Sequence, residues 1–117
     1  MLNIDLVSEE EIAQVVPAFY AKVRKDPMLG PIFNDAIDEW PEHLEKLQAF
    51  WSSVMRASGR YKGQPMPAHV KHASRITPDA FTRWLQLWGE TTDELLPPDA
   101  AAAMQDRAQR IAESLSL

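Results

Sequence analysis

The side chains best suited to chemistry in this 117-residue chain are three histidines, set among four Trp, four Phe and two Tyr. His43 lies in a long amphipathic segment, and His69 and His72 lie three residues apart on a later one. A neutral imidazole can ligate a metal or move a proton, and it can also be a buried residue with satisfied hydrogen bonds. The chain has no Cys, which excludes disulfides, thiolate metal sites and thioether-attached cofactors. Any cofactor must therefore be held by His, carboxylates or packing.

Three interpretations of the histidines stay open on residue types alone. The first is a helical bundle with one satisfied core histidine and two surface histidines. The second is a metal site at His69-x-x-His72, for which no further ligands are obviously placed. The third is a haem, a flat apolar cofactor that would use the surplus aromatic residues and whose iron one imidazole can ligate. Motifs of other site classes, such as GxGxxG, GxxxxGK[ST], HExxH and GxSxG, are absent from the sequence.

Composition and charge narrow the class of protein further. A mass of 13.3 kDa allows one domain, residues 1–117, with a real core. The net charge of -5 disfavours a nucleic-acid partner and an anionic membrane surface. No stretch approaches the roughly 20 apolar residues of a membrane span. The first residues lack the basic and apolar regions of a signal peptide, so we expect a cytoplasmic protein.

Nearly every segment has a helical pattern, and Pro and Gly residues separate the segments. The first helix is predicted over about residues 9–25, opened by a capping box of Ser8 and Glu11. Pro17 is expected to weaken or kink this helix and could divide it into two pieces. A turn and a short element are predicted to follow at two dipeptides, Asp26-Pro27 and Gly30-Pro31.

The second long helix, predicted over about residues 38–57, has the clearest pattern. At about 100° per residue, His43 lies inside the apolar arc and not on the polar side. The apolar arc also holds Leu44, Leu47, Phe50, Trp51 and Val54, whereas Ser52, Ser53 and Arg56 lie opposite.

The remaining chain predicts a short helix near residues 68–74 and two longer helices. Thr77 is predicted to cap the first of these, with Pro78 at its first helical position. Its apolar face is predicted to hold Phe81, Trp84, Leu85, Trp88 and Leu95, and Pro97-Pro98-Asp99 separates it from the last helix. No run alternates with period two for long enough to predict a strand, so the fold class is all-α.

Several short motifs follow one another in a specific order. They are Phe19-Tyr20-x-x-Val23, Leu29-Gly30-Pro31-Ile32-Phe33, Trp40-x-x-His43, Phe50-Trp51, Tyr61-x-Gly63-x-Pro65, His69 and Phe81-x-x-Trp84-Leu85. In this order and spacing the sequence resembles the group III truncated haemoglobins over roughly residues 9–112. The chain has no Gly-Gly pair, which separates it from the other two truncated groups. The resemblance implies a truncated globin, a two-over-two helical sandwich around a noncovalent b-type haem.

The resemblance also implies roles for particular residues. His69 matches the proximal iron ligand, and Tyr20 matches the tyrosine that faces the distal side. Trp84 matches a tryptophan that donates to the bound ligand, and His43 matches a distal histidine that acts more as a gate than as a donor. The other haem-pocket positions are Phe33, Leu47, Phe50, Trp51, Tyr61, Met66, Val70 and Phe81.

One departure from the family pattern concerns His72, which stands where we expect an apolar residue. We expect it to be a solvated residue near the haem edge and not a second iron ligand. The candidates for contacts with the haem propionates are Arg60, Lys71, Arg75 and His72.

The function implied by the resemblance is binding of dioxygen, nitric oxide, carbon monoxide or a similar ligand at an iron with an open sixth position. A polar pocket that holds oxygen tightly favours oxidation of nitric oxide to nitrate, or activation of peroxide, over reversible transport or sensing. Turnover would need an external electron donor, because the chain has no flavin or nicotinamide segment. Whether the chain is an enzyme stays open, and a haem-free interaction module is the remaining alternative. We expect a monomer or weak dimer.

Overall fold

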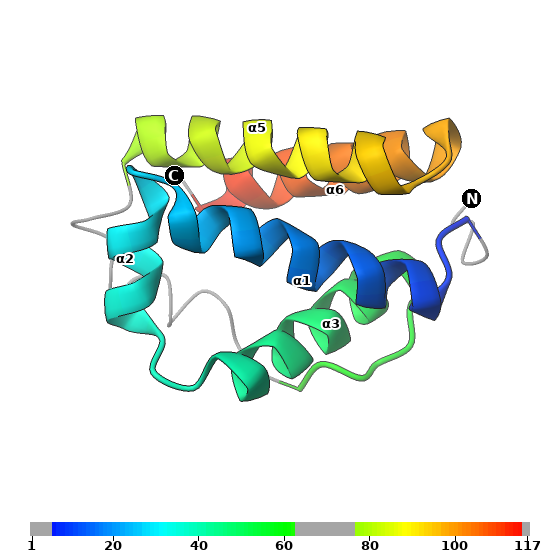
Figure 1. Ribbon diagram of the computed structural model, residues 1–117. Helices are drawn as coiled ribbons and strands as arrows, with labels where there is room; N and C mark the ends of the chain where they lie inside the picture. The colour runs from blue at the N-terminus through cyan, green and yellow to red at the C-terminus, as the bar shows by residue number, and fades with distance from the viewer. Residues whose placement is uncertain (1–5, 63–76, 116–117) are drawn as a thin grey trace.

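The computed structural model describes residues 6–62 and 77–115, and within these ranges the chain forms α-helices and no strand (Figure 1). The helices are α1 (Glu9–Lys25), α2 (Leu29–Ala36), α3 (Trp40–Arg56), α5 (Pro78–Leu95) and α6 (Pro98–Leu115). The predicted all-α class is confirmed. The short helix predicted near residues 68–74 lies outside the described ranges. None of the described helices is long and apolar enough to span a bilayer.

The helices form two layers (Figure 1). α1 packs on α3 in one layer, α5 packs on α6 in the other, and α1 packs on α5 between them. α2 lies across one end and contacts both α1 and α5. Since each helix buries one apolar stripe, this arrangement gives a single core with α1 at its centre.

α1 begins where the sequence predicts. The Ser8 hydroxyl accepts from the Glu11 N–H, and the Glu11 carboxylate accepts from the Ser8 N–H, which completes the capping box. The expected division of the helix is wrong, because α1 is continuous through Pro17. α1 buries side chains against both α3 and α5. This packing outweighs the roughly 3 kcal/mol that a proline costs inside a helix.

Of the two predicted turn dipeptides, only Asp26-Pro27 lies in the turn between α1 and α2. Gly30 and Pro31 instead lie in the first turn of α2, where the missing N–H of proline leaves no intrahelical bond unmade. A Cβ atom at position 30 would lie 2.7 Å from the backbone oxygen of Arg24. Glycine therefore allows α2 to start this close to the end of α1.

α5 also begins as predicted, because the Thr77 hydroxyl accepts from the Ala80 N–H at 3.1 Å. The predicted apolar face is wrong at its far end, where Leu95 is 41% exposed. The helix ends at Leu95. The backbone of Leu96 is extended, and this directs the Leu96 side chain into the core. Hence Leu96 is the buried residue at the corner between α5 and α6.

Candidate functional site

Tyr20 is at the centre of the residues that the sequence predicts for the distal side. It lies on α1 and is only 4% exposed. Its ring centroid lies 4.7 Å from that of Phe19, 5.8 Å from that of Phe33 on α2 and 5.9 Å from that of Trp40 on α3. Its hydroxyl is hydrogen-bonded to the side chain of Trp84 on α5. Side chains from four helices, including α1 itself, therefore surround the Tyr20 phenol.

The environment of Tyr20 keeps the phenol neutral. Burial raises the pKa of Tyr20 to about 12, and the hydrogen bond from Trp84 opposes part of that rise. An indole N–H can only donate, so the Tyr20 oxygen is the acceptor in this bond. The phenol keeps its own O–H proton, and this proton remains a donor for a further acceptor.

Trp84 is partly buried and belongs to an aromatic group in the core. Its ring lies edge-on to Phe19 at 5.7 Å and parallel to Trp88 at 6.1 Å. An indole has a single N–H, and that of Trp84 is directed at Tyr20. Donation from Trp84 to a bound ligand stays a prediction, and it requires this N–H to be shared or exchanged.

His43 lies on α3 beside the same group. Its ring is edge-on to Trp40, with 5.9 Å between the centroids. Burial, followed by the positive charge of Lys46, lowers the pKa of His43 below 6.5, so the imidazole is neutral at pH 7. Because Trp40 contacts both Tyr20 and His43, the structure brings the three predicted distal residues into one cluster.

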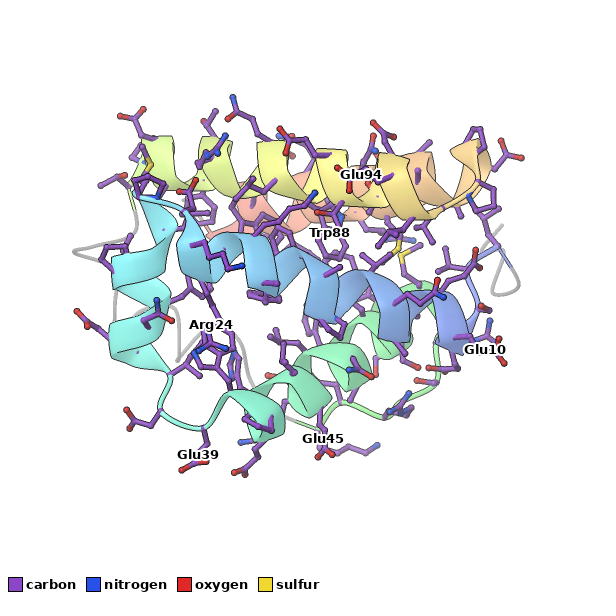
Figure 2. All side chains as sticks on the ribbon, in the orientation of Figure 1. Glu10, Arg24, Glu39, Glu45, Trp88 and Glu94 are labelled. Atoms are coloured by element: carbon purple, nitrogen blue, oxygen red, sulfur yellow. The ribbon has the colours of Figure 1, made fainter. Side chains whose placement is uncertain are left out.

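Trp40 contributes to this site although the sequence analysis used it only as part of a motif. It lies three residues before His43, which places both on one side of α3. The Arg24 guanidinium lies over its ring at 4.7 Å from the centroid. In Figure 2, Arg24 extends from α1 toward α3. The spacing of Trp40 from His43 was the signal in the sequence that could have identified it.

The predicted apolar arc of α3 is divided in two by the structure. One member of the arc, Trp51, is buried in the core, where Trp40 and Met55 of the same helix join it. Beside it runs a stripe of partly buried side chains at helical spacing: His43, Leu47, Phe50 and Val54. The described residues cover this stripe only in part, although three of its four members are apolar.

The residues present fit a haem. Large apolar side chains that are only partly buried come from α2, α3 and α5; they include Phe33, Leu47, Phe50, Val54, Phe81, Trp84 and Leu85. A flat apolar group would cover such surface with a gain of roughly 25 cal/mol per Å². The polar members of the distal cluster, a phenol and an imidazole, are both neutral at pH 7.

Two predicted haem-pocket residues near the end of α3 lie in different surroundings. Tyr61 is partly buried, with its ring edge-on to Phe50 at 5.2 Å and its N–H donated to the Ser53 hydroxyl at 2.9 Å. Trp51 is 1% exposed and stacks on Trp88 with 4.4 Å between the centroids. Trp88 in turn lies between α1 and α5 and donates its indole N–H to the Met104 carbonyl on α6 (Figure 2). Contact of Trp51 with haem stays a prediction.

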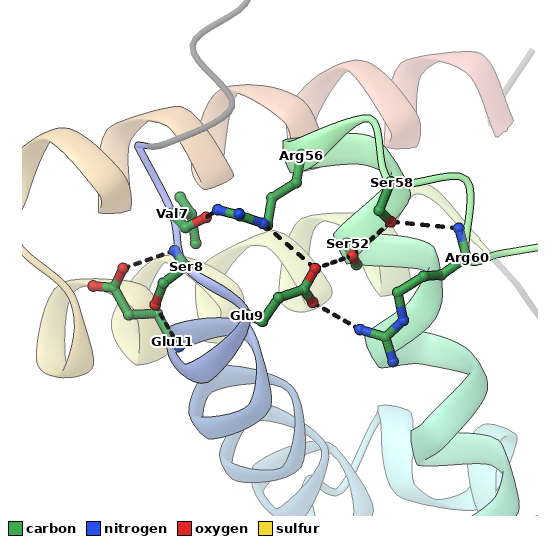
Figure 3. Close-up of polar contacts among 8 residues, drawn as sticks. All are labelled: Val7, Ser8, Glu9, Glu11, Ser52, Arg56, Ser58 and Arg60. Carbon is green, nitrogen blue, oxygen red and sulfur yellow. Dashed lines mark hydrogen bonds and ion pairs between the residues drawn. The ribbon is translucent and has the colours of Figure 1, made fainter.

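Arg60, a predicted propionate contact, is paired with Glu9 at the start of α1 at 2.7 Å. Glu9 also accepts from the Ser52 hydroxyl at 2.6 Å and lies 3.4 Å from Arg56 (Figure 3). Ser52 is fully buried, although the sequence places it on the polar side of α3, because the first turn of α1 covers it. The propionate role of Arg60 stays a prediction and requires Arg60 to leave Glu9.

Six of the predicted site residues lie outside the described ranges: Met66, His69, Val70, Lys71, His72 and Arg75. Their roles stay predictions. Within residues 6–62 and 77–115, no three acidic or histidine side chains are grouped as ligands of a metal ion.

Together, the two helical layers and the aromatic distal cluster define a protein of the globin class. A profile of the family described as bacterial-like globin matches residues 5–114, and the chain belongs to this family. It is 36% identical over 115 residues to a group 3 truncated hemoglobin of Campylobacter jejuni, across 95% of this chain and 90% of that protein. The crystal structure of the group III truncated hemoglobin from Campylobacter jejuni matches with a TM-score of 0.84 at 34% identity, over 98% and 92% of the two chains.

These comparisons confirm the predicted resemblance to the group III truncated haemoglobins and the truncated globin fold. Membership of the globin family makes the chain a haem protein that binds small gaseous ligands. The interpretation of the chain as a haem-free interaction module is therefore wrong.

Proposed function

We propose that the chain binds dioxygen and other diatomic gases at a five-coordinate haem iron, with Tyr20, Trp84 and His43 on the side where the gas binds. The haem is of the noncovalent b type, since the chain has no Cys for a thioether bond. His69 is the proximal ligand. When bound, haem supplies an iron with an open position for the gas. The observation that carries this proposal is the neutral, buried phenol of Tyr20.

The O–H of Tyr20 is the principal donor to the gas. Phe19, Phe33 and Trp40 surround its ring and exclude water, so a hydrogen bond made there acts in a medium of low dielectric constant. Trp84 donates to the Tyr20 oxygen, which restricts the direction of the hydroxyl and polarises its O–H bond. A hydrogen bond from this group to an acceptor that gains negative charge contributes roughly 1.5–3 kcal/mol.

His43 is the gate to this site. Its ring lies at the partly exposed edge of the α3 stripe and is held by one ring contact with Trp40. A neutral imidazole in that position carries no charge that must be desolvated when the ring moves. The ring can therefore admit a ligand by rotating, while Tyr20 stays in place.

Retention of oxygen favours chemistry over transport. A strong distal donor slows release, which suits a protein that oxidises nitric oxide to nitrate or activates peroxide. Such an enzyme needs an external electron donor and acts as a cytoplasmic monomer or weak dimer. The alternative is a reversible oxygen carrier or a gas sensor, which needs no donor.

An absorption spectrum of the purified, haem-loaded protein tests the proposal. The ferric protein, the reduced protein and the reduced protein with carbon monoxide are expected to give three distinct Soret bands. A colourless protein that takes up no added haem would overturn the proposal. To separate the two functions, the oxygenated protein is mixed with nitric oxide and a reductant. Nitrate formed over many turnovers supports the enzyme, and a single equivalent supports the carrier or sensor.

A further inference from the structure

Asp26 is the only charged residue that is buried in the part of the chain that the structure describes. Its side chain is 4% exposed and lies 2.7 Å from the Arg83 guanidinium, measured from Oδ1 to Nε. Its other oxygen, Oδ2, accepts from the N–H groups of Met28 and Leu29 at 3.1 and 3.0 Å. Both oxygens of this carboxylate therefore have hydrogen-bond partners in the fold.

These contacts join three helices through one carboxylate. Asp26 is the C-cap residue that follows α1, Leu29 begins α2, and Arg83 lies in the second turn of α5. The same three helices carry Tyr20, Phe33 and Trp84, which meet at the distal site. The end of α1, the start of α2 and the start of α5 lie together at one end of the molecule (Figure 1).

Stability alone is a weak explanation for this pair. Burying the Asp26 carboxylate costs about as much free energy as its attraction to Arg83 returns, and the Arg83 side chain is 37% exposed, so the pair adds little to the free energy of unfolding. Its fixed geometry is the more distinctive property. A second ion pair, Lys22 with Glu94 at 3.0 Å, also joins α1 to α5, but its carboxylate is 60% exposed, against 4% for that of Asp26. An exposed pair of this kind restrains the two helices only weakly.

We propose that the Asp26–Arg83 pair is a positioning device that sets α5 against α1 so that Trp84 donates to Tyr20. Arg83 directly precedes Trp84 in α5, so any shift of the first turns of α5 moves both side chains together. An N–H···O hydrogen bond needs a donor–acceptor distance of about 2.7–3.2 Å, so a shift of α5 by one residue rise, about 1.5 Å, is enough to break the bond from Trp84. Arg83 is thus a positioning residue for the distal donor, and this step rests on the proposed function of Tyr20.

The test compares Arg83→Gln with Lys22→Gln, a matched control that removes a charge from the other ion pair between the same helices. The first readout is the NMR signal of the Trp84 indole N–H, which reports the hydrogen bond directly. We expect Arg83→Gln to shift this signal and Lys22→Gln to leave it in place. Arg83→Lys, which keeps the charge, is expected to restore it in part, and this variant gives the same readout should Arg83→Gln fail to fold.

The second readout is the oxygen dissociation rate of the haem-loaded protein. Arg83→Gln is expected to raise it by about tenfold, since a displacement of about 1 Å is enough to misalign such a site. In a Tyr20→Phe/Trp84→Phe background the same substitution is expected to change the rate less than twofold, because the pair acts through these two side chains. An unshifted Trp84 signal, or a rate increase that persists in the Tyr20→Phe/Trp84→Phe background, would overturn the proposal. Should the unsubstituted protein fail to bind oxygen, the proposed function fails, whereas the NMR signal still decides the role of Arg83.

Discussion

Replacing Tyr20 by Phe removes a single oxygen atom from the centre of the distal cluster. The ring contacts with Phe19, Phe33 and Trp40 remain, because they involve the aromatic ring and not the hydroxyl. Two hydrogen bonds are lost: the one that we propose the phenol makes to a bound gas, and the one that it accepts from Trp84. The substitution therefore tests the hydrogen bonds of the Tyr20 hydroxyl while the packing of the ring is unchanged.

The expected effect on oxygen release follows from these two bonds. A donor to a charged acceptor contributes roughly 1.5–3 kcal/mol, which corresponds to a tenfold to hundredfold faster dissociation when it is lost. The substitution also frees the N–H of Trp84, which can then donate to the gas and recover part of this free energy. We therefore expect about a tenfold increase for Tyr20→Phe and about a hundredfold increase when Trp84→Phe is added.

Stopped-flow displacement of oxygen by carbon monoxide measures the dissociation rate. Thr82→Val serves as the control, since it removes an exposed hydroxyl from α5 and is expected to leave the rate unchanged. Urea denaturation of Tyr20→Phe should show a loss of about 1–3 kcal/mol, because the Trp84 N–H loses its acceptor. An unchanged dissociation rate in a variant with a normal haem spectrum would remove Tyr20 from the distal role.

Three further outcomes are expected. His69→Ala should lose the normal ferrous haem spectrum and His72→Ala should keep it, and the reverse result would exchange their roles. The pKa of Asp26 lies below 3.8: burial raises it, but the hydrogen bonds from Leu29, Arg83 and Met28 outweigh burial. The folded carboxylate therefore contributes stability that is present above pH 3.8 and is lost as the pH falls through its folded pKa. Asp26→Asn should flatten the acid side of the stability curve measured by urea denaturation, and an unchanged slope would contradict this. Gly30→Ala should destabilise the fold by about 1–3 kcal/mol, because the added Cβ would lie 2.7 Å from the backbone oxygen of Arg24. Gly89→Ala, with open space at its Cβ, should not be destabilising in the same denaturation assay, and equal losses at both positions would argue against the steric explanation.

The helices and much of the distal cluster were predictable because their signals are local or follow the family pattern. The capping box at Ser8 and the Thr77-Pro78 start depend on residues within one helical turn. The position of His43 within the apolar arc follows from helical periodicity alone. The family pattern named Tyr20 and Trp84 as distal residues, and the structure brings them into contact.

Contacts between residues far apart in the chain could not be predicted from local sequence patterns. Ser52 appears on a polar face and is buried only because the start of α1 lies over it, 43 residues away in the sequence. Pro17 stays inside a helix because packing on both sides of α1 outweighs its local preference. Leu95, although it continues the apolar pattern of α5, is exposed because the chain turns there into α6.

The order of residues along the chain was enough to establish the helical class, the helix boundaries, the aromatic surplus and the family. The partners of Tyr20, Asp26 and Glu9 depended on how the helices pack, since Arg83 is 57 residues from Asp26. Helix formation is governed by neighbours within four residues, whereas the direction of a donor or the pairing of a charge is governed by contacts that exist only after the layers have come together.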